Sequence, residues 1–167
     1  MIKGLHHNAY RCRDSEETRQ FYEDFLGLPL VNAFRIEETM TGRKTGTGVL
    51  HSFFQLDDGS SLAFFEAPHM PFEFKDQHDF DLHIALEVEP DVLEAMFERG
   101  KREGREVRGI SDHKFIRSIY FRDPNGYVIE LTAKTAVHDT AMDPSANEAR
   151  GILDRWQLAK AQTLAAP

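Results

Sequence analysis

The sequence has little of three things on which whole classes of protein depend: cysteine, long apolar runs and basic charge. Cys12 is the only cysteine, which excludes an internal disulfide framework and a cysteine-rich metal site. No stretch approaches the roughly 18 apolar residues of a membrane-spanning helix, so we expect no membrane partner. The 28 Asp and Glu residues outnumber the 20 Lys and Arg residues, and a net charge of −8 argues against nucleic acid as a partner.

Two further absences reduce the range of functions that the sequence allows. The glycine patterns of phosphate loops and dinucleotide-binding loops are missing, which argues against a nucleotide enzyme of those types. The first residues contain no apolar signal core, which predicts a cytoplasmic protein. What the sequence does contain is histidine, eight in 167 residues, and histidine is the commonest metal ligand and acid/base side chain. The sequence therefore raises the question of which histidines carry chemistry.

Caps, turns and apolar spacing predict a chain of mixed strands and helices. Asp14 and Glu17 have the capping-box spacing that begins a helix, and Gly27 is suited to end it. Asp58-Gly59 is a strong hairpin turn, and Pro90 suits the first turn of a second helix. The expected strands are 4–12, 29–38, 48–56, 61–66, 81–88, 105–110, 115–122 and 127–132, and the expected helices are 14–26, a stretch opened by Glu89-Pro90 and about 145–161.

This order is an internal repeat of the pattern βαβββ, followed by a helix. The fold class we predict is α+β, with two βαβββ units at about 4–66 and 81–132 in one domain, 1–133, and a helical tail, 134–167. His7 and His83 lie in the first strands of the two units. A pseudo-twofold relation would bring such positions together at one central site.

The last strands of the two units also match. Glu130 of the second unit aligns with Phe64 of the first if one residue is inserted after Gly59, and with Ala63 if it is not. Two imidazoles and a carboxylate can hold a divalent metal, and such a set with open positions suits non-haem Fe(II) oxygenases. Strand alternation places His7 on one face with Arg11. The alternative reading makes each of these histidines an ordinary surface residue.

Four segments of the chain resemble the vicinal oxygen chelate superfamily, which includes glyoxalase I, fosfomycin-resistance proteins, methylmalonyl-CoA epimerase and type I extradiol dioxygenases. The resemblance spans about residues 4–133. It implies a U-shaped mixed sheet around a metal held by His7, His83 and Glu130, and a homodimer. The resembling segments are 7–14, 21–28, 82–88 and 123–131.

One departure from this family pattern concerns a fourth metal ligand. Glyoxalase I and the epimerase have Glu or Gln at the position that aligns here with Phe64 or Ala63, and neither of these side chains can coordinate a metal. Glu66 shares a strand face with Phe64 and lies roughly 6–7 Å further along. It could be a displaced fourth ligand, a base or a surface carboxylate.

Another part of the chain resembles the extradiol dioxygenase signature. His113, Tyr120, Asp123-Pro124 and Glu130 follow its spacing, and Ser111 departs from the residue expected two before the histidine. A hairpin turning at 123–126 would place Tyr120 opposite or nearly opposite Glu130 on one face. The resemblance implies His113 as the catalytic acid/base and Tyr120 as a catalytic hydrogen-bond donor; the alternatives are a solvated loop histidine and an ordinary strand aromatic.

The sequence thus predicts an Fe(II)-dependent extradiol-type dioxygenase that cleaves the ring of a catechol-like diol with O₂. Arg11 and Phe64 are expected to bind the substrate. The alternatives are a glyoxalase-like lyase or epimerase using Mn, Ni, Zn or Co, and a non-catalytic small-molecule binding or resistance protein. His51 is left undecided, and the remaining histidines are expected away from the site: His6, His69, His78 and His138.

Overall fold

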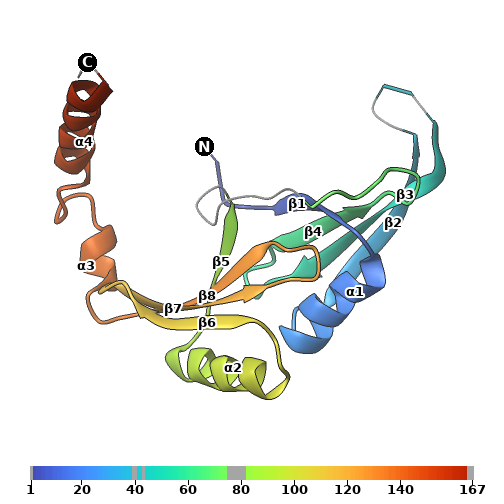
Figure 1. The fold of residues 1–167 in the computed structure, drawn as a ribbon, viewed down its shortest axis with the longest axis horizontal. Helices are drawn as coiled ribbons and strands as arrows, with labels where there is room; N and C mark the ends of the chain where they lie inside the picture. Colours follow the sequence, from blue (N-terminus) through green and yellow to red (C-terminus); the bar gives the residue numbers. More distant parts are fainter. Residues whose placement is uncertain (1, 39–40, 43, 75–81, 165–167) are drawn as a thin grey trace. The chain divides into compact units, whose positions relative to one another are not determined.

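The elements follow one another in the predicted order, as Figure 1 traces along the chain. The structure is a computed structural model and describes residues 2–38, 41–42, 44–74 and 82–164. The first repeat contains β1 (His7–Cys12), α1 (Ser15–Arg19), the π-helical turn η1 (Gln20–Phe25), β2 (Leu30–Glu38), β3 (Lys44–Gln55) and β4 (Ser61–Glu66). The second contains β5 (His83–Glu87), α2 (Pro90–Arg102), β6 (Val107–Asp112), β7 (Ile116–Arg122) and β8 (Val128–Lys134), and the tail contains α3 (His138–Met142) and α4 (Ala149–Leu164).

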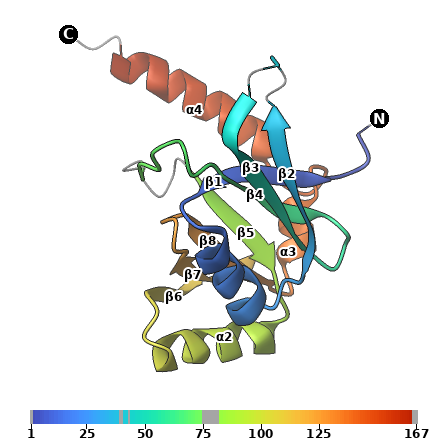
Figure 2. The same ribbon diagram turned by 90° about the vertical axis from the view of Figure 1, so that its right-hand side faces the viewer.

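The strands form two four-stranded sheets with the orders β1-β4-β3-β2 and β5-β8-β7-β6. In the first sheet β1 runs parallel to β4, while β2, β3 and β4 are antiparallel neighbours. β2 and β3 make a long hairpin ladder (Figure 2). The predicted α+β class and the repeated βαβββ order are confirmed. The short helix α3 was not expected, and β3 begins four residues earlier than predicted.

The chain divides into two compact units that differ from the sequence repeats. Unit 1 is Met1–Ile84 together with Phe121–Ile129, and unit 2 is Ala85–Tyr120 together with Glu130–Pro167. The turn between β7 and β8 and the strand residues next to it therefore pack with unit 1, although the rest of both strands belongs to unit 2. Part of the predicted 68–81 linker lies outside the described residues.

Helix α1 begins as its sequence predicts. The Asp14 carboxylate accepts the backbone N–H of Glu17 at 2.8 Å, which satisfies one of the free N–H groups of the first turn. Glu17 forms an ion pair with Arg13, so only the Asp14 half of the capping box is seen. The following turn buries Phe21, Tyr22 and Phe25 against the sheet.

The turn at residues 123–126 is fastened to this helical segment by buried hydrogen bonds. The Tyr22 hydroxyl donates to Oδ2 of Asp123 at 3.0 Å, and the Asn125 amide donates to Oγ1 of Thr18 at 3.2 Å. Oδ1 of Asn125 accepts the backbone N–H of Arg13 at 2.8 Å. These contacts explain why this turn belongs to unit 1, since each buried polar group finds its partner there.

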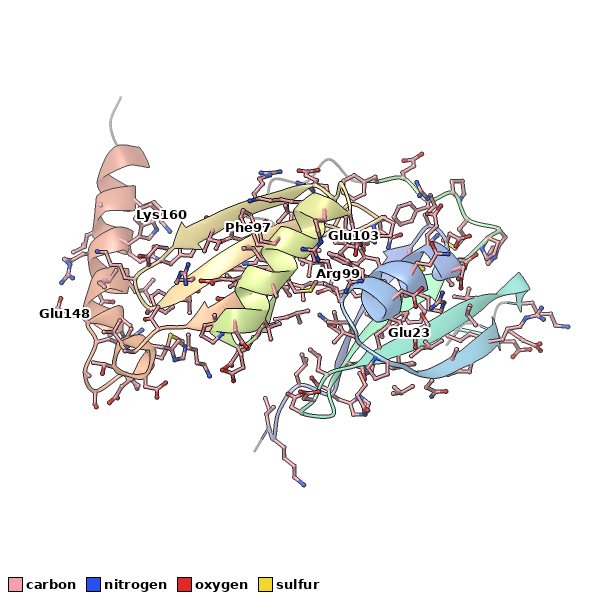
Figure 3. The ribbon with its side chains drawn as sticks, turned by 90° about the horizontal axis from the view of Figure 1, so that it is seen from below. Glu23, Phe97, Arg99, Glu103, Glu148 and Lys160 are labelled. Atoms are coloured by element: carbon pink, nitrogen blue, oxygen red, sulfur yellow. The ribbon has the colours of Figure 1, made fainter. Side chains whose placement is uncertain are left out.

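Unit 2 places α2 against its strands and exposes the polar side of that helix. Leu93 is fully buried, whereas Arg99 and Glu103 pair on the outer surface at 2.7 Å (Figure 3). Lys101 lies 3.9 Å over the ring of Phe97. In the tail, Trp156 of α4 is 64% exposed. None of the described helices is long and apolar enough to cross a membrane.

Candidate functional site

The register between β1 and β4 defines which side chains share a face with His7. His7 pairs with Ser61, Ala9 with Ala63, and Arg11 with Phe65. Residues paired directly across two strands project from the same side of a sheet. The side carrying these residues is called the His7 face below.

The register removes Phe64 from this face. Phe64 pairs with Tyr10, is fully buried, and lies with its ring centroid 4.7 Å from that of Tyr22. The expectation that Phe64 stands beside His7 is therefore wrong, while its part in substrate binding stays a prediction. Ala63 takes the position, as the alignment without an inserted residue allows. The methyl group of Ala63 offers no atom to a metal.

Glu66 also lies on the opposite face, because it pairs with Cys12. Its Oε2 atom accepts the backbone N–H of Ser15 at 2.7 Å. A carboxylate in this position satisfies a free donor at the start of α1 and interacts favourably with the positive end of the helix. Of the roles that the sequence left open for Glu66, the geometry supports neither the displaced ligand nor the base.

His7 has aromatic and imidazole neighbours on its own face. Its ring centroid lies 5.3 Å from that of Phe53 and 6.1 Å from that of His51. Nδ1 of His7 lies 2.8 Å from Nδ1 of His6, so one ring donates and the other accepts. When His7 is the donor, its Nε2 atom keeps the free lone pair that a metal ligand needs. His6, which was expected off the site, thus contacts the first predicted ligand.

His51 is the functional candidate that sequence reasoning left undecided. It is 5% exposed, and its Nδ1–H donates to the backbone carbonyl of Phe64 at 3.0 Å. The imidazole stacks on the ring of Phe65 with centroids 3.9 Å apart. This hydrogen bond fixes the tautomer of the neutral ring and leaves Nε2 unprotonated. Strand alternation along β3 puts His51 and Phe53 on the same side, and this signal was available in the sequence.

The predicted catalytic pair of unit 2 is in contact. Nε2 of His113 lies 2.9 Å from the Tyr120 hydroxyl, and Glu130 lies close enough for its charge to act on the same phenol. The predicted meeting of Tyr120 and Glu130 across the β7–β8 hairpin is therefore confirmed. Partial burial and then the Glu130 charge raise the pKa of Tyr120 above 10.0.

The three predicted metal ligands are divided between the units. His7 and His83 belong to unit 1, and the buried Glu130 belongs to unit 2. Among the residues that the structure describes, no three His, Cys, Asp or Glu side chains group closely enough to hold a metal ion. The donor types, two imidazoles and one carboxylate, fit a divalent transition metal. The ligand set stays a prediction from residue type and sequence match.

The other histidines have simpler surroundings. His138 pairs with Asp139 at 2.9 Å on the surface of the tail, and His69 is exposed in a turn. His78 lies outside the described residues.

Arg11 lines a cavity of about 510 Å³ within unit 1. The cavity runs along β1 at Ala9 and Tyr10 and is lined on its other sides by residues 71–74, Leu82 and Tyr127. The Tyr127 hydroxyl donates to the backbone carbonyl of Arg11 at 2.9 Å. The volume falls in the range of roughly 300–1,000 Å³ that small-molecule pockets usually have. The sequence predicted Arg11 as a substrate-binding residue, and the cavity makes it accessible to a ligand.

Comparison with known families gives one match over most of the chain. Residues 4–131 match the model of the Glyoxalase/Bleomycin resistance protein/Dioxygenase superfamily. Among curated proteins, the chain is similar to the metallothiol transferase FosB of Shouchella clausii (strain KSM-K16). The two are 27% identical over 139 residues, which cover 81% of this chain and 83% of the relative.

Solved structures show the same fold at low identity. The fosfomycin resistance protein FosX of Listeria monocytogenes, complexed with Mn(II) and sulfate, is 24% identical with a TM-score of 0.58, over 83% of this chain and 98% of that one. A glyoxylase/bleomycin resistance protein/dioxygenase domain from Frankia sp. EAN1pec has a TM-score of 0.65 at 18% identity, over 81% of this chain and 100% of that one. A glyoxalase/dioxygenase from Nostoc punctiforme has a TM-score of 0.61 at 22% identity, over 80% and 92%.

Proposed function

Because the chain belongs to the Glyoxalase/Bleomycin resistance protein/Dioxygenase superfamily, we propose that it is a metal-dependent enzyme that opens the ring of a catechol-like diol with O₂. The proposed metal is Fe(II), and the proposed ligands are His7, His83 and Glu130. The observation that carries this proposal is the hydrogen bond between His113 and Tyr120, with the Glu130 charge acting on the same phenol. Within the superfamily, an acid/base histidine touching a tyrosine beside the carboxylate ligand favours ring cleavage.

Each residue of this group has a task in the proposed reaction. When bound, the metal lowers the pKa of a coordinated hydroxyl group and brings substrate and O₂ together. The Tyr120 hydroxyl orients the substrate oxygen by hydrogen bonding. His113 accepts a proton from the substrate and later returns one, passing it through the 2.9 Å contact with Tyr120. The His7 face supplies an apolar wall through Phe53 and Phe65.

A second candidate function is the addition of a thiol or of water to a small toxic molecule, which would make the protein a resistance enzyme. It is favoured by the similarity to the metallothiol transferase FosB and by the fold shared with FosX, whose structure contains Mn(II). The glyoxalase-like lyase has less support, because Ala63 stands where that reaction would need a fourth protein ligand. We expect a homodimer with a small-molecule substrate under either candidate.

The deciding experiment is oxygen consumption by protein that has been loaded anaerobically with Fe(II). Addition of a catechol panel should consume O₂ and form a yellow ring-fission product. His113→Gln should lower the turnover number about 10²- to 10⁴-fold, as expected for loss of a general acid/base. His138→Gln, which removes a histidine of the tail, is the matched control and should leave the rate unchanged.

A metal measurement separates the candidates. Protein purified without a histidine tag should contain stoichiometric iron if the dioxygenase proposal is right. Full occupancy by metal with no turnover of any catechol would contradict it. Formation of an adduct from fosfomycin and a thiol by the Mn(II)-loaded protein would instead establish the second candidate.

A further inference from the structure

The cavity in unit 1 contains a cation that has no ionic partner among the residues the structure describes. Most arginines whose side chains are described form ion pairs with Asp or Glu, as Arg13 does with Glu17. Arg11 is paired with no carboxylate in the described part of the chain. Its Nη2 group donates to the backbone carbonyl of Met70 at 3.2 Å, and Nη1 reaches only the Met70 sulfur at 4.0 Å. Nε is buried and has no hydrogen-bond partner among the described residues.

These contacts leave much of the guanidinium unsatisfied. Arg has five N–H donors, and a thioether sulfur is a weak acceptor. In a chain with a net charge of −8, an unpaired arginine at a cavity is a specific feature rather than part of a basic surface. A carboxylate is the partner that matches the planar fork of Arg, since it can accept two parallel N–H bonds.

The rest of the cavity is suited to a flat apolar body. The rings of Tyr10 and Tyr127 lie 5.2 Å apart, and the ring of Phe74 lies 6.5 Å from that of Tyr127. The ring of Phe74 packs against Gly126, because a Cβ atom at Gly126 would come within 2.1 Å of that ring. Glu73 also lines the cavity, but its side chain is exposed and its charge is screened by water.

We propose that this cavity binds an aromatic carboxylate, with the ring against Tyr10, Tyr127 and Phe74 and the carboxylate on Arg11. The inference goes beyond the proposed function and does not depend on it, because the cavity would bind the carboxylate and its ring and take no part in ring opening. Arg11 follows His7 by four residues on the same face of β1, which is roughly 13 Å along the strand. Because Tyr10 projects from the opposite face of β1, the ring bound in the cavity does not stand beside His7.

Binding of a ligand without the diol tests this pocket independently of catalysis. The probe is 3-phenylpropanoate, measured by isothermal titration calorimetry with the metal-free protein, and 3-phenylpropanamide is the uncharged control. We expect the acid to bind about 10- to 100-fold more tightly than the amide, the difference made by one charge-assisted hydrogen-bonded pair. Arg11→Gln should abolish this difference, and Arg11→Lys should restore part of it.

Arg13→Gln is the matched control, because Arg13 is two residues away and already paired with Glu17. It should bind the acid as the unaltered protein does. Circular dichroism shows whether each variant is folded. Equal affinities for acid and amide, no binding of either, or unchanged binding by folded Arg11→Gln would overturn the proposal. Acid binding without dioxygenase activity would keep the pocket and remove only the proposed reaction.

Discussion

The hydrogen bond from Tyr22 to Asp123 provides a stability test with a magnitude that follows from its burial. Tyr22 is fully buried, and its hydroxyl donates to Oδ2 of Asp123 at 3.0 Å. Tyr22→Phe removes one oxygen and leaves the ring packing intact. Because a hydrogen bond to a charged group contributes about 1.5–3 kcal/mol, we expect the free energy of unfolding to fall by that amount. The corresponding decrease in Tm is about 3–12 °C for a chain of this size.

Tyr127→Phe is a matched control in the same unit. The Tyr127 hydroxyl donates to an uncharged backbone carbonyl, that of Arg11, at 2.9 Å. Its loss should cost only about 0.5–1.5 kcal/mol. Urea denaturation followed by circular dichroism measures both variants. If Tyr22→Phe costs no more than Tyr127→Phe, the reasoning from burial and charge is refuted.

The pH dependence of the Tyr22 effect follows from the titration of Asp123. Desolvation raises the pKa of Asp123 above 3.8, while the bonds from Asn125, Tyr127 and Tyr22 act against it. Removing the Tyr22 hydroxyl therefore raises the folded-state pKa further. A carboxyl group whose folded pKa is raised costs stability as pH rises above its unfolded value, since the unfolded chain ionises first. The cost of Tyr22→Phe should thus be larger at pH 7 than at pH 3; an equal cost at both would contradict this account.

Three other substitutions or probes test features of unit 1. Glu66→Ala should destabilise the protein by about 0.5–2 kcal/mol through loss of the bond to Ser15, and metal affinity by calorimetry should stay unchanged; a sharp fall would restore Glu66 as a ligand. Burial raises the pKa of the Cys12 thiol to about 11, so a disulfide reagent at pH 8 should react with it only after urea is added, and rapid labelling of native protein would disprove this. Gly126→Ala should lower Tm and weaken 3-phenylpropanoate binding, because Gly126 has φ +89° and its added methyl group would displace Phe74; unchanged binding would show that Phe74 does not shape the pocket.

Local sequence features were sufficient to predict the order of the helices and strands. The Asp14 cap, the Asp58-Gly59 turn and the alternation of β1 each depend on residues close together in the chain, and the structure has all three. The contact between Tyr120 and Glu130 was predictable for the same reason, because a short turn determines which residues of a hairpin meet.

The faces of β4 were not predictable in this way. β4 is buried on both sides over its first four residues, so its sequence has no polar alternation that would reveal the side toward His7. The parallel register with β1, set by contacts more than fifty residues apart, decides that Ala63 and not Phe64 shares that face. The same long-range register separates Glu66 from the predicted site. His51 was ambiguous because an imidazole inside a strand is compatible with water or with a buried polar bond.

Because residues Phe121–Ile129 belong to unit 1, the protein cannot be divided into its two units by a single cut in the chain. A cut after Ile84 would give an N-terminal fragment without Asp123, Asn125 and Tyr127. The Tyr22 hydroxyl would lose its acceptor on Asp123, and the Thr18 hydroxyl would lose its donor on Asn125. The N-terminal half therefore lacks part of unit 1, whereas the C-terminal half contains all of unit 2. Unit 1 should therefore recover its structure only when both halves are co-expressed, and an N-terminal half that is soluble alone would need a substitute for the missing turn.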